Sequence, residues 1–394
     1  MGASSENEYS RRGVSATKEE VHALAALLPS PLFPHSFCRV YPDYLTDSAK
    51  WATLVHSDGV GTKAILAYLM WKETGDLQVW RQLAQDVVVM NTDDVFCTAA
   101  PRHLLYCSLI NRNRHKIPGQ VLQALVEGTL AFFEAMQRFG VHLHYMGGET
   151  ADVGDAVRTL TVDAAVTCRI PKNRIVKNEI KPGDVIVGFA SYGQATYENC
   201  YNSGIGCNGL TSARHDVLKS DYGQRYPETV DPAVDHQLIY RGSRLLLDTY
   251  QGYTVADLLL SPTRTYVPLL LAMHENYFDQ IHGIVHCTGG GQTKVLHFIN
   301  NLHIVKNNLF PLPPVFQLVR QESTASLKEL YTVFNMGHRL EVYCPEQIAP
   351  VLVQLASSFK IEARIIGEVR ASDRACLTLH IEHQTIDFYR NSPL

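Results

Sequence analysis

A short glycine-containing stretch, SDGVGTK at residues 57–63, constrains the fold of this chain most strongly. It joins an apolar, strand-like segment at 53–55 to a helix-like segment at 64–75. Two glycines between a strand and a helix allow a sharp backbone turn. The stretch therefore predicts a turn between these two segments that can bend around an anion.

The residue types in this stretch are those of a phosphate-binding turn. Gly59 and Gly61 let backbone N–H groups approach an anion, and Lys63 adds positive charge at the start of the helix. Asp58 favours a magnesium nucleotide over a bare phosphate, because the metal needs carboxylate oxygens. The spacing matches neither GxxxxGK nor GxGxxG. The alternative is a plain Asp-Gly turn with a solvated lysine.

The chain has 394 residues, more than one hydrophobic core usually contains. We expect an extension over 1–50, an N-terminal domain of alternating strands and helices over 51–170, a polar and basic linker over 171–184, and a C-terminal domain over 185–394. Within the extension, a cap signal followed by an amphipathic pattern predicts a short helix over about 15–28.

Composition excludes several classes of protein. The formal net charge of -4 argues against a nucleic-acid-binding surface. No apolar run approaches the roughly 18 residues that span a bilayer, and the polar N-terminus lacks a signal-peptide pattern, so we expect a cytoplasmic protein without membrane contact. The nine cysteines form no CxxC pair, which argues against zinc and fits buried thiols in a reducing compartment.

A long helix is predicted over residues 77–100, with Asp86, Asp93 and Asp94 along it. Asp93 and Asp94 follow Asp86 by about two helical turns, which brings the three carboxylates to one side. Like charges on one side repel unless a cation lies between them, so a metal site is a natural interpretation. The alternative is a solvent-exposed acidic stripe.

A second helix is predicted over 118–139, followed by a strand at 141–146 and then by GGET at 147–150. An acid directly after a glycine pair at the end of a strand lies where ligands bind in open sheets. Glu149 and Asp152 are therefore candidates for metal or substrate contacts. The alternative is a hairpin turn with solvated acids.

The C-terminal half contains a second glycine loop. A strand at 281–286 runs into CTGGG at 287–291, and a helix is expected to start near Gln292. Successive glycines at such a junction direct N–H groups at an anion, near the positive end of the helix. Earlier, a strand at 185–190 leads into a polar loop at 191–209, whose length suggests a functional role.

Five motifs follow the order seen in the phosphoribosylformylglycinamidine cyclo-ligase (AIR synthetase) family, and the resemblance spans residues 10–370. They are SDGVGTK at 57–63, the aspartates at 93–94, GGETAD at 147–152, HCTGGG at 286–291 and FNMG at 334–337. SPTRTYV at 261–267 and RGVSA at 12–16 resemble further landmarks. The resemblance implies an α/β (α+β) two-domain fold with a C-terminal mixed sheet, and a homodimer whose N-terminal sheets join into a barrel. It also implies purine biosynthesis: with ATP and Mg2+, formylglycinamidine ribotide is cyclised to aminoimidazole ribotide.

The resemblance also implies roles for individual residues. ATP or phosphate would be bound by Asp58, Gly59, Val60, Gly61, Thr62, Lys63, Gly147, Gly148, Thr288, Gly289, Gly290 and Gly291. The metal would be held by Asp58, Asp94, Asp93 and Glu149, and the substrate by Asn208, Gly209, His286 and Asn335. Lys63, Glu149 and Asp152 would serve catalysis. Which glycine loop binds which phosphate is left open.

The sequence departs from the family pattern at three places, the first of which bears on the metal. Asp93 stands where the family has Asn, GCNG at 206–209 replaces HSNG, and YCS at 106–108 replaces LDY. His215 or Tyr201 are candidates to replace the lost histidine.

Two alternatives to the cyclo-ligase follow. One is another enzyme of the superfamily, such as thiamine-monophosphate kinase, selenide kinase or a hydrogenase-maturation protein. Selenide kinase would need a reactive cysteine near the first glycine loop, and the maturation protein a C-terminal cysteine, and neither signature is seen here. The other is an ATP-binding regulator or scaffold that has lost catalysis.

Overall fold

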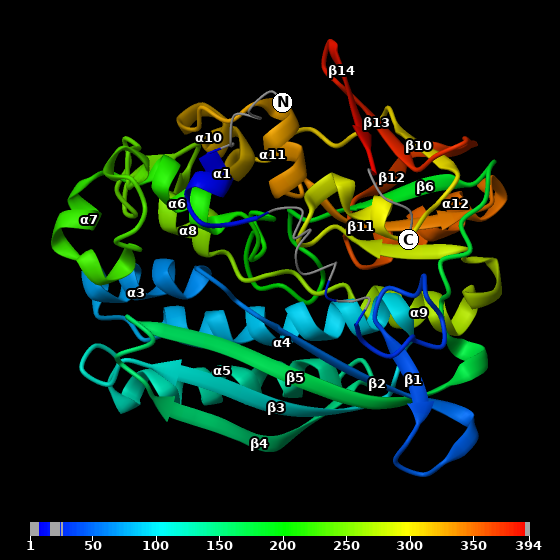
Figure 1. Ribbon diagram of the computed structural model, residues 1–394, viewed down its shortest axis with the longest axis horizontal. Coiled ribbons are helices and arrows are strands. Elements are labelled where there is room, and N and C mark those ends of the chain that lie inside the picture. Colours follow the sequence, from blue (N-terminus) through cyan, green and yellow to red (C-terminus); the bar gives the residue numbers. More distant parts are fainter. Residues whose placement is uncertain (1–7, 16–23, 25–26, 391–394) are drawn as a thin grey trace.

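The computed structural model describes residues 8–15, 24 and 27–390. Figure 1 shows the N-terminal half below and the C-terminal half above, with the long helix α4 (Gln78–Thr98) between them. The first sheet has the order β1 (Val40–Asp43), β2 (Ser48–Gly59), β5 (Leu160–Pro171), β3 (His103–Arg112), β4 (His142–Asp152). The second has the order β14 (Gln384–Tyr389), β13 (Cys376–Ile381), β10 (Leu302–Lys306), β12 (Ala363–Ala371), β6 (Val185–Ala190), β11 (His338–Cys344), β9 (Gly283–His286). A small ribbon pairs β7 (Thr249–Tyr250) with β8 (Tyr253–Thr254).

The helices are distributed over both halves. The other α-helices are α1 (Glu8–Arg11), α3 (Lys63–Thr74), α5 (Gly119–Gln137), α6 (Leu210–Val217), α7 (Asp221–Arg225), α8 (Val255–Leu260), α9 (Val267–Asn276), α10 (Pro314–Glu322), α11 (Leu327–Val333) and α12 (Ala349–Ser358). Short 3-10 helices are η1 (Lys172–Arg174), η2 (Pro227–Thr229), η3 (His236–Leu238), η4 (Phe278–Gln280), η5 (Gly291–His297) and η6 (Glu346–Ile348). Within the part of the chain that the structure describes, every helix is too short or too polar to cross a bilayer.

The first sheet is mixed, because β5 is antiparallel to β2 and β3, whereas β3 and β4 are parallel. Alternate residues of β5, from Val162 to Ile170, are buried, as expected for a strand with one covered face. Helices α4 and α5 cover this inner face (Figure 1). Helix α4 also contacts α9 and β9 of the C-terminal half, so it is buried on nearly all sides.

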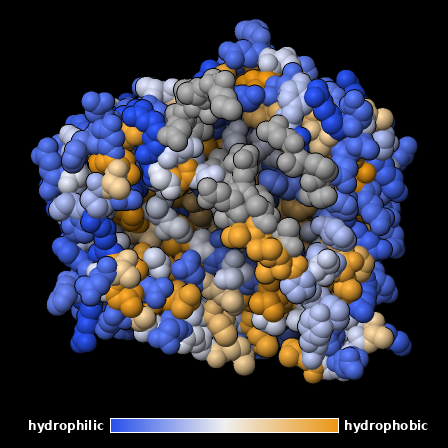
Figure 2. Space-filling model, in the orientation of Figure 1, coloured by the Kyte–Doolittle hydropathy of each residue, from blue (hydrophilic) through white to orange (hydrophobic). Residues whose placement is uncertain are grey.

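The opposite, outer face of the first sheet is apolar and is not covered by any described element (Figure 1). Val55, Leu105, Leu109 and Met146 on β2, β3 and β4 are 60%, 43%, 43% and 58% exposed. Figure 2 shows apolar side chains at the surface of the lower half, where this sheet lies. A face with this composition is typical of a protein contact surface.

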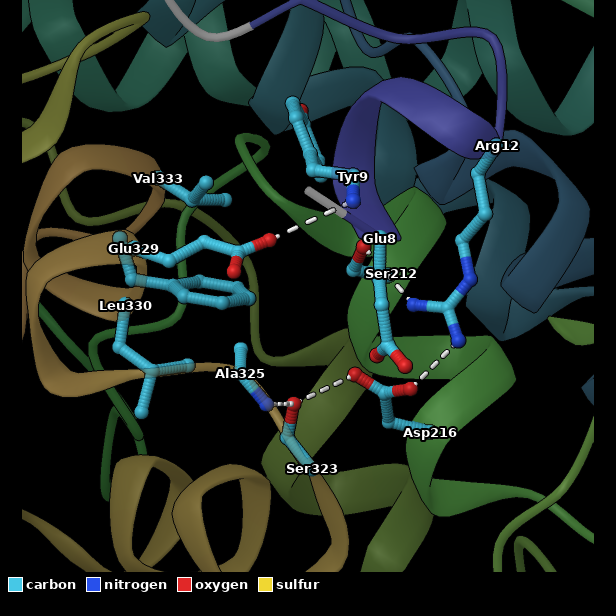
Figure 3. A pocket seen from close by; sticks show the side chains of 11 residues that line it. Glu8, Tyr9, Arg12, Ser212, Asp216, Ser323, Ala325, Glu329, Leu330 and Val333 are labelled. Carbon is cyan, nitrogen blue, oxygen red and sulfur yellow. Dashed lines mark hydrogen bonds and ion pairs between the residues drawn. The ribbon is translucent and has the colours of Figure 1, made fainter. Parts of the chain in front are cut away.

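Arg12 fixes the N-terminal segment to the C-terminal half. Its guanidinium donates to Ser212 Oγ at 2.9 Å and to Asp216 Oδ1 at 2.6 Å, and Ser323 Oγ donates to Asp216 Oδ2 at 2.8 Å. Figure 3 shows these side chains around a small pocket, where their polar atoms bond one another. The pocket is therefore a junction between α1, α6 and the end of α10, and not an open ligand site.

The polar loop at 191–209 is ordered by a buried arginine. Arg264 donates to both carboxylate oxygens of Glu198, and its Nη1 donates to the carbonyls of Ala190 and Tyr192. Asn202 in the same loop donates to the Pro262 carbonyl at 2.8 Å. The loop is thus held against the 261–267 segment.

The long helices predicted over 77–100 and 118–139 are confirmed as α4 and α5, and the strand over 185–190 as β6. The prediction that GGET follows a strand is wrong, because β4 continues through it to Asp152 with a register shift opposite Tyr106–Ser108. The helix expected near Gln292 is the 3-10 helix η5. Strands β10 and β14 were not predicted, and most of the helix expected over 15–28 lies outside the described residues.

Candidate active site

Three side chains meet where β2 passes under α4. His56 and Asp58 are two residues apart on β2, so both point to the inner face. Asp94 comes from α4, and one ligand atom from each of the three residues lies within 4.8 Å of the others. His56 Nε2 is 3.3 Å from Asp94 Oδ2. We call these three residues the β2–α4 cluster.

Asn91 fixes the two elements that carry the cluster. Its side-chain oxygen accepts from the Asp58 backbone N–H at 3.1 Å, and its amide group donates to the Asp58 carbonyl at 3.0 Å. Asn91 is on α4 one turn before Asp94. These two hydrogen bonds therefore fix the position of β2 along α4.

Asp94 is also bound from the C-terminal half. His286, at the end of β9, has Nδ1 2.6 Å from Asp94 Oδ1, and Arg339 Nε on β11 donates to His286 Nε2 at 2.9 Å. Since Nε2 accepts, the His286 proton lies on Nδ1 and is donated to Asp94. Burial opposes ionisation, but these bonds and the one from His56 hold the pKa of Asp94 well below its ordinary value. Burial also opposes a charge on His56, whereas Cys38 and Asp94 raise the pKa of His56 well above its ordinary value.

Asp93 turns away from this cluster. It accepts from Thr265 Oγ1 at 2.6 Å and from the Tyr266 backbone N–H at 3.0 Å, just before α9 begins. Burial raises the pKa of Asp93, partly offset by His286 and Arg339. Asp93 therefore holds the 261–267 segment, and the structure does not bring it into the cluster as the sequence led us to expect.

Lys63 is fully buried and already paired. Its Nζ donates to Asp86 Oδ1 at 2.7 Å and to the Ser261 carbonyl at 2.6 Å, and Asp86 Oδ1 also accepts from Thr263. The ammonium thus links α3, α4 and the 261–267 segment. Contact between Lys63 and a phosphate stays a prediction, and it would require the ammonium to share or leave these partners.

The first glycine bend lies against the start of α6. Gly61 has φ +51°, which favours glycine, and Val60 is buried beneath the turn. Thr62 Oγ1 lies 2.9 Å from Thr211 Oγ1 in the first turn of α6. Gly59 has no room for a side chain, because a Cβ would lie 1.8 Å from Asp163 Oδ1. The bend is therefore close to Asn208 and Gly209, which directly precede α6.

The second glycine loop is also close to Asn208. Gly289, Gly290 and Gly291 have φ values of +57°, +143° and +50°, which residues with side chains rarely adopt. A Cβ on Gly289 would lie 3.9 Å from the Asn208 amide nitrogen. The neighbouring Thr288 is buried. The structure thus brings both glycine loops to the start of α6.

Asn335 and Gly209 have structural partners in this region. The Asn335 amide nitrogen donates to the Gly204 carbonyl at 2.8 Å, and its oxygen accepts from Ser191 Oγ at 2.9 Å. Gly209 has φ +77° and faces the ring of Phe334, which a Cβ would meet at 2.3 Å. A substrate contact by either residue stays a prediction.

The GGET strand lies apart from the β2–α4 cluster. Glu149 is paired with Leu109, which is paired with Asp163 and then with Gly59, so three interstrand steps of about 4.8 Å separate Glu149 from Gly59. It also faces the outer side, as Leu109 does. Within one chain, Glu149 therefore does not join Asp58 as a metal ligand.

The neighbours of Glu149 share this location. Gly147 and Gly148 have φ +107° and +158° in β4, and a Cβ on Gly148 would lie 2.1 Å from the Ser108 carbonyl oxygen. Asp152 ends the strand and accepts from Arg112 Nε at 2.6 Å. The hydrogen bond from Arg112 lowers the pKa of Asp152. The candidate residues of this strand thus form a separate group on β4.

Sequence reasoning missed His56 and Arg339. The signal for His56 was available, because a residue two positions before Asp58 on a strand shares its face. Arg339 follows directly after FNMG and His338, and only the fold brings it to His286. It also missed a buried group in which Glu341 accepts from Lys306 and from His338 Nε2. Cys287 lies within 4.8 Å of His338 and Glu341, but the Lys306 ammonium already supplies the positive charge there.

The arrangement suits the binding of a divalent cation and of phosphate. The β2–α4 cluster contains two carboxylates and a histidine, and both glycine loops lie near the start of α6. His286 and Arg339 extend the site into the C-terminal half. Phosphoryl transfer needs little more than such positioning and charge neutralisation.

Family models match both halves of the chain. The N-terminal domain of "AIR synthase related protein" matches residues 41–170, and the C-terminal domain of the same family matches residues 181–380. Among curated relatives, the phosphoribosylformylglycinamidine cyclo-ligase of Methanocaldococcus jannaschii is 27% identical over 321 residues, covering 80% of this chain and 77% of the relative. The enzyme of that name from Methanococcus vannielii is 28% identical over 315 residues, covering 79% and 76%.

Solved structures share the fold at low identity. The structure of PurLQS from Thermotoga maritima has a TM-score of 0.54 at 13% identity, covering 97% of this chain, which spans about half (50%) of that chain. The HypE–HypF complex has a TM-score of 0.53 at 16% identity and covers 96% of this chain and 100% of the other. Both halves of the chain match one family in the expected order, on a two-domain fold of mixed sheets and helices. The chain therefore belongs to the family of AIR synthase related proteins.

Proposed function

We propose that the chain catalyses the ATP-dependent cyclisation of formylglycinamidine ribotide to aminoimidazole ribotide, a ligase reaction of purine biosynthesis that releases ADP and phosphate. The observation that carries the proposal is the convergence of the β2–α4 cluster and both glycine loops, in a chain that is similar to cyclo-ligases over four fifths of its length. ATP is the co-substrate, and a divalent cation accompanies it.

The chemistry explains why such a site is needed. A formamide oxygen is a poor leaving group, so ATP first phosphorylates it, forming an O–P bond as the γ-phosphate leaves ADP. The amidine nitrogen of the same molecule then attacks the formyl carbon, and the phosphorylated oxygen departs as phosphate. Both steps depend on the orientation of the reactants and on neutralisation of phosphate charge.

The residues present fit a cation. Asp94 is held ionised by His286, and Asp58 and His56 each have a ligand atom within 4.8 Å of one of its oxygens. A bound Mg2+ would neutralise charge on the transferred phosphoryl group. His286, held by Arg339, orients Asp94, and the N–H groups of Gly289, Gly290 and Gly291 bind a phosphate. Asp58 and Asp94 are the carboxylates on which the site depends.

We further propose that the chain acts as a homodimer through the outer face of the first sheet. Leu105, Leu109 and Met146 supply the apolar surface, and Glu149 lies among them on the same face. Since Glu149 is remote from Asp58 within one chain, its role in the reaction requires a second copy on this face. Glu149 and Gly147–Gly148 then serve the site of the other protomer.

The test is direct. Purified protein is supplied with formylglycinamidine ribotide, ATP and Mg2+, and both ADP and the aminoimidazole product are measured. We expect the two products in equal amounts. A folded protein that forms no aminoimidazole product would reject the proposal.

A second candidate is a divergent member that binds ATP without turnover, as a regulator or scaffold. It is motivated by Gly206, which stands where the family has the histidine of HSNG. The next residue, Cys207, has its Sγ 3.4 Å from Asp86 Oδ1. ATP binding measured by calorimetry, together with product formation, separates the two candidates. Tight ATP binding with zero turnover would favour the scaffold.

A further inference from the structure

Three histidines gather on the outer face of the first sheet, where β3 and β4 begin. His142 and His144 are two residues apart on β4, so both point to the same face. His103 on β3 is paired directly with His142 in the parallel ladder. His103 and His144 are exposed, and His142 is half-buried. We call these three residues the histidine trio.

The histidine trio lies outside the proposed reaction site. It is on the opposite face of the sheet from the β2–α4 cluster, and it is at the other end of β4 from Glu149. Strand β4 is at the edge of the sheet, where it pairs only with β3 among the described strands (Figure 1). The trio therefore spans the last two strands of this sheet, away from the glycine loops.

The distances within the trio are those of ligands that share one ion. His103 Nδ1 lies 3.0 Å from His144 Nε2. The centre of the His103 ring is 5.1 Å from that of His142 and 5.3 Å from that of His144. Two imidazole nitrogens bound to one tetrahedral Zn2+ at about 2.0 Å are about 3.3 Å apart, and their ring centres are about 5 Å apart. His103 thus has, to each of the other two rings, the separation that a shared ion requires.

Rotation of the rings completes the site. The rings are nearly parallel, with interplanar angles of 19° and 16°, whereas the ligands of one ion direct their lone pairs at a common point. The χ2 torsion of histidine has a broad energy profile, so an exposed imidazole rotates at little cost. Each ring that binds the ion through one nitrogen keeps its proton on the other nitrogen.

We propose that His103, His142 and His144 bind one Zn2+ ion, with water in the fourth position. Imidazole nitrogen suits Zn2+, whereas Mg2+ and Ca2+ take oxygen ligands. Two neighbouring strands hold the three histidines on a rigid frame, and the ion ties the edge strand β4 to β3. The inference is independent of the proposed function, because no residue of the trio serves the ring closure.

The experiment titrates Co2+, as a spectroscopic substitute for Zn2+, into the full chain without nucleotide and under reducing conditions. Tetrahedral Co2+ absorbs strongly in the visible range, octahedral Co2+ at a mainly oxygen-lined site absorbs weakly, and a thiolate ligand adds a strong near-ultraviolet band. We expect the strong visible bands without the thiolate band, and we expect Zn2+ to abolish them by displacing Co2+.

Variants assign the bands to the trio. His103→Gln and His144→Gln should each weaken Zn2+ binding by at least about a hundredfold. The matched control His380→Gln changes an exposed histidine on β13 and should bind Zn2+ as the native chain does. Because the substituted side chains are exposed, circular dichroism should show all three variants folded.

Stability gives a second readout. Saturating Zn2+ should raise the urea midpoint of the native chain and of His380→Gln, and leave that of His144→Gln unchanged. Absence of the visible bands in the native chain, a thiolate band, or Zn2+ binding that survives in both trio variants would overturn the inference. An equal loss of binding in His380→Gln would also overturn it, since it would show adventitious binding by surface histidines.

Discussion

The two faces of the first sheet differ in what covers them and in what they carry. The inner face lies under α4 and α5 and presents His56 and Asp58 to Asp94. The outer face is open, apolar and carries Glu149. Successive side chains of a strand point to opposite faces. Asp58 and Glu149, which come from different motifs of the sequence, therefore lie on opposite faces of the sheet.

One chain therefore brings together only part of the site that the sequence led us to expect. The inner face carries the proposed cation ligands, and His286, which is bonded to Arg339, also bonds Asp94. On the outer face, Glu149 lies far from the other candidate site residues, and no described element packs on the apolar surface around it. The proposed second copy on the outer face would account for both features.

The largest effect is expected at the inner face. Asp94→Asn removes a cluster carboxylate and its negative charge next to His286 and His56, so kcat/KM should fall by about a thousandfold or more. Steady-state kinetics measures this, with circular dichroism to show that the variant is folded. The control Asp373→Asn, on the exposed turn after β12, should stay within about twofold. Equal activity of Asp94→Asn and the native chain would show that the inner face does not carry the reaction site.

Mixing variants of the two faces tests whether Glu149 of one protomer serves the site of the other. Glu149→Gln alone should lower kcat by about a hundredfold without loss of the dimer. When Glu149→Gln and Asp94→Asn protomers are mixed and allowed to exchange, half of the dimers contain one intact site, so about one quarter of native activity should return. No recovery despite exchange, followed by mass spectrometry, would show that both residues serve the same protomer.

Leu109→Lys tests whether a second protomer packs on the outer face of the first sheet. A charged side chain at the centre of an apolar contact should weaken dimerisation by about a hundredfold. Analytical ultracentrifugation measures the monomer–dimer equilibrium. The control Leu247→Lys changes another exposed leucine, in the C-terminal half, and should leave it unchanged. A monomeric native chain would contradict the proposed interface.

Asp93 provides a structural counterpart to Asp94 on the same helix. Asp93→Ala leaves Thr265 and the Tyr266 N–H without their acceptor, so the free energy of unfolding should fall by about 3 kcal/mol. Asp93→Asn keeps an acceptor oxygen, so we expect a loss of under about 1 kcal/mol. Urea denaturation measures both. Equal stability of the two variants would show that the stabilisation does not come from the acceptor oxygen at position 93.

The smallest expected effect is a pH dependence of the free energy of unfolding, caused by the buried His274. Burial lowers the pKa of His274 to about 4 from its ordinary value of 6.5. The folded state therefore binds this proton less readily than the unfolded state does. The contribution of neutral His274 to stability is fully present above pH 6.5 and is lost as the pH falls from 6.5 towards 4. Between pH 7 and 5 this amounts to about 2 kcal/mol. His274→Gln should flatten the urea midpoint over that range, and an unchanged slope would contradict the assignment.

Local patterns were sufficient for much of the fold. Periodicity predicted α4, α5 and β6, and the glycine motifs predicted the two loops whose positive φ values the structure shows. GGET was misjudged because a strand can absorb two glycines through a register shift, which sequence does not distinguish from a turn. Strand β14 pairs only with β13 at the edge of its sheet, so little burial marks it in the sequence.

The site was harder to predict, because its contacts are long-range. Asp86, Asp93 and Asp94 share a helix, yet each has a different partner: Lys63, Thr265 and His286. Spacing along a helix gives the direction of a side chain but not what arrives from elsewhere in the chain. Helical repulsion among the three acids, the reason for expecting one metal site, is relieved here by three separate sets of donors.

The central claim is that ATP phosphorylates the formyl oxygen before the ring closes. The most direct measurement supplies formylglycinamidine ribotide labelled with 18O at the formyl oxygen, in unlabelled water with ATP and Mg2+, and analyses the released phosphate by mass spectrometry. The account predicts one 18O atom in each phosphate released with the aminoimidazole product. Unlabelled phosphate, with the 18O in water instead, would contradict it.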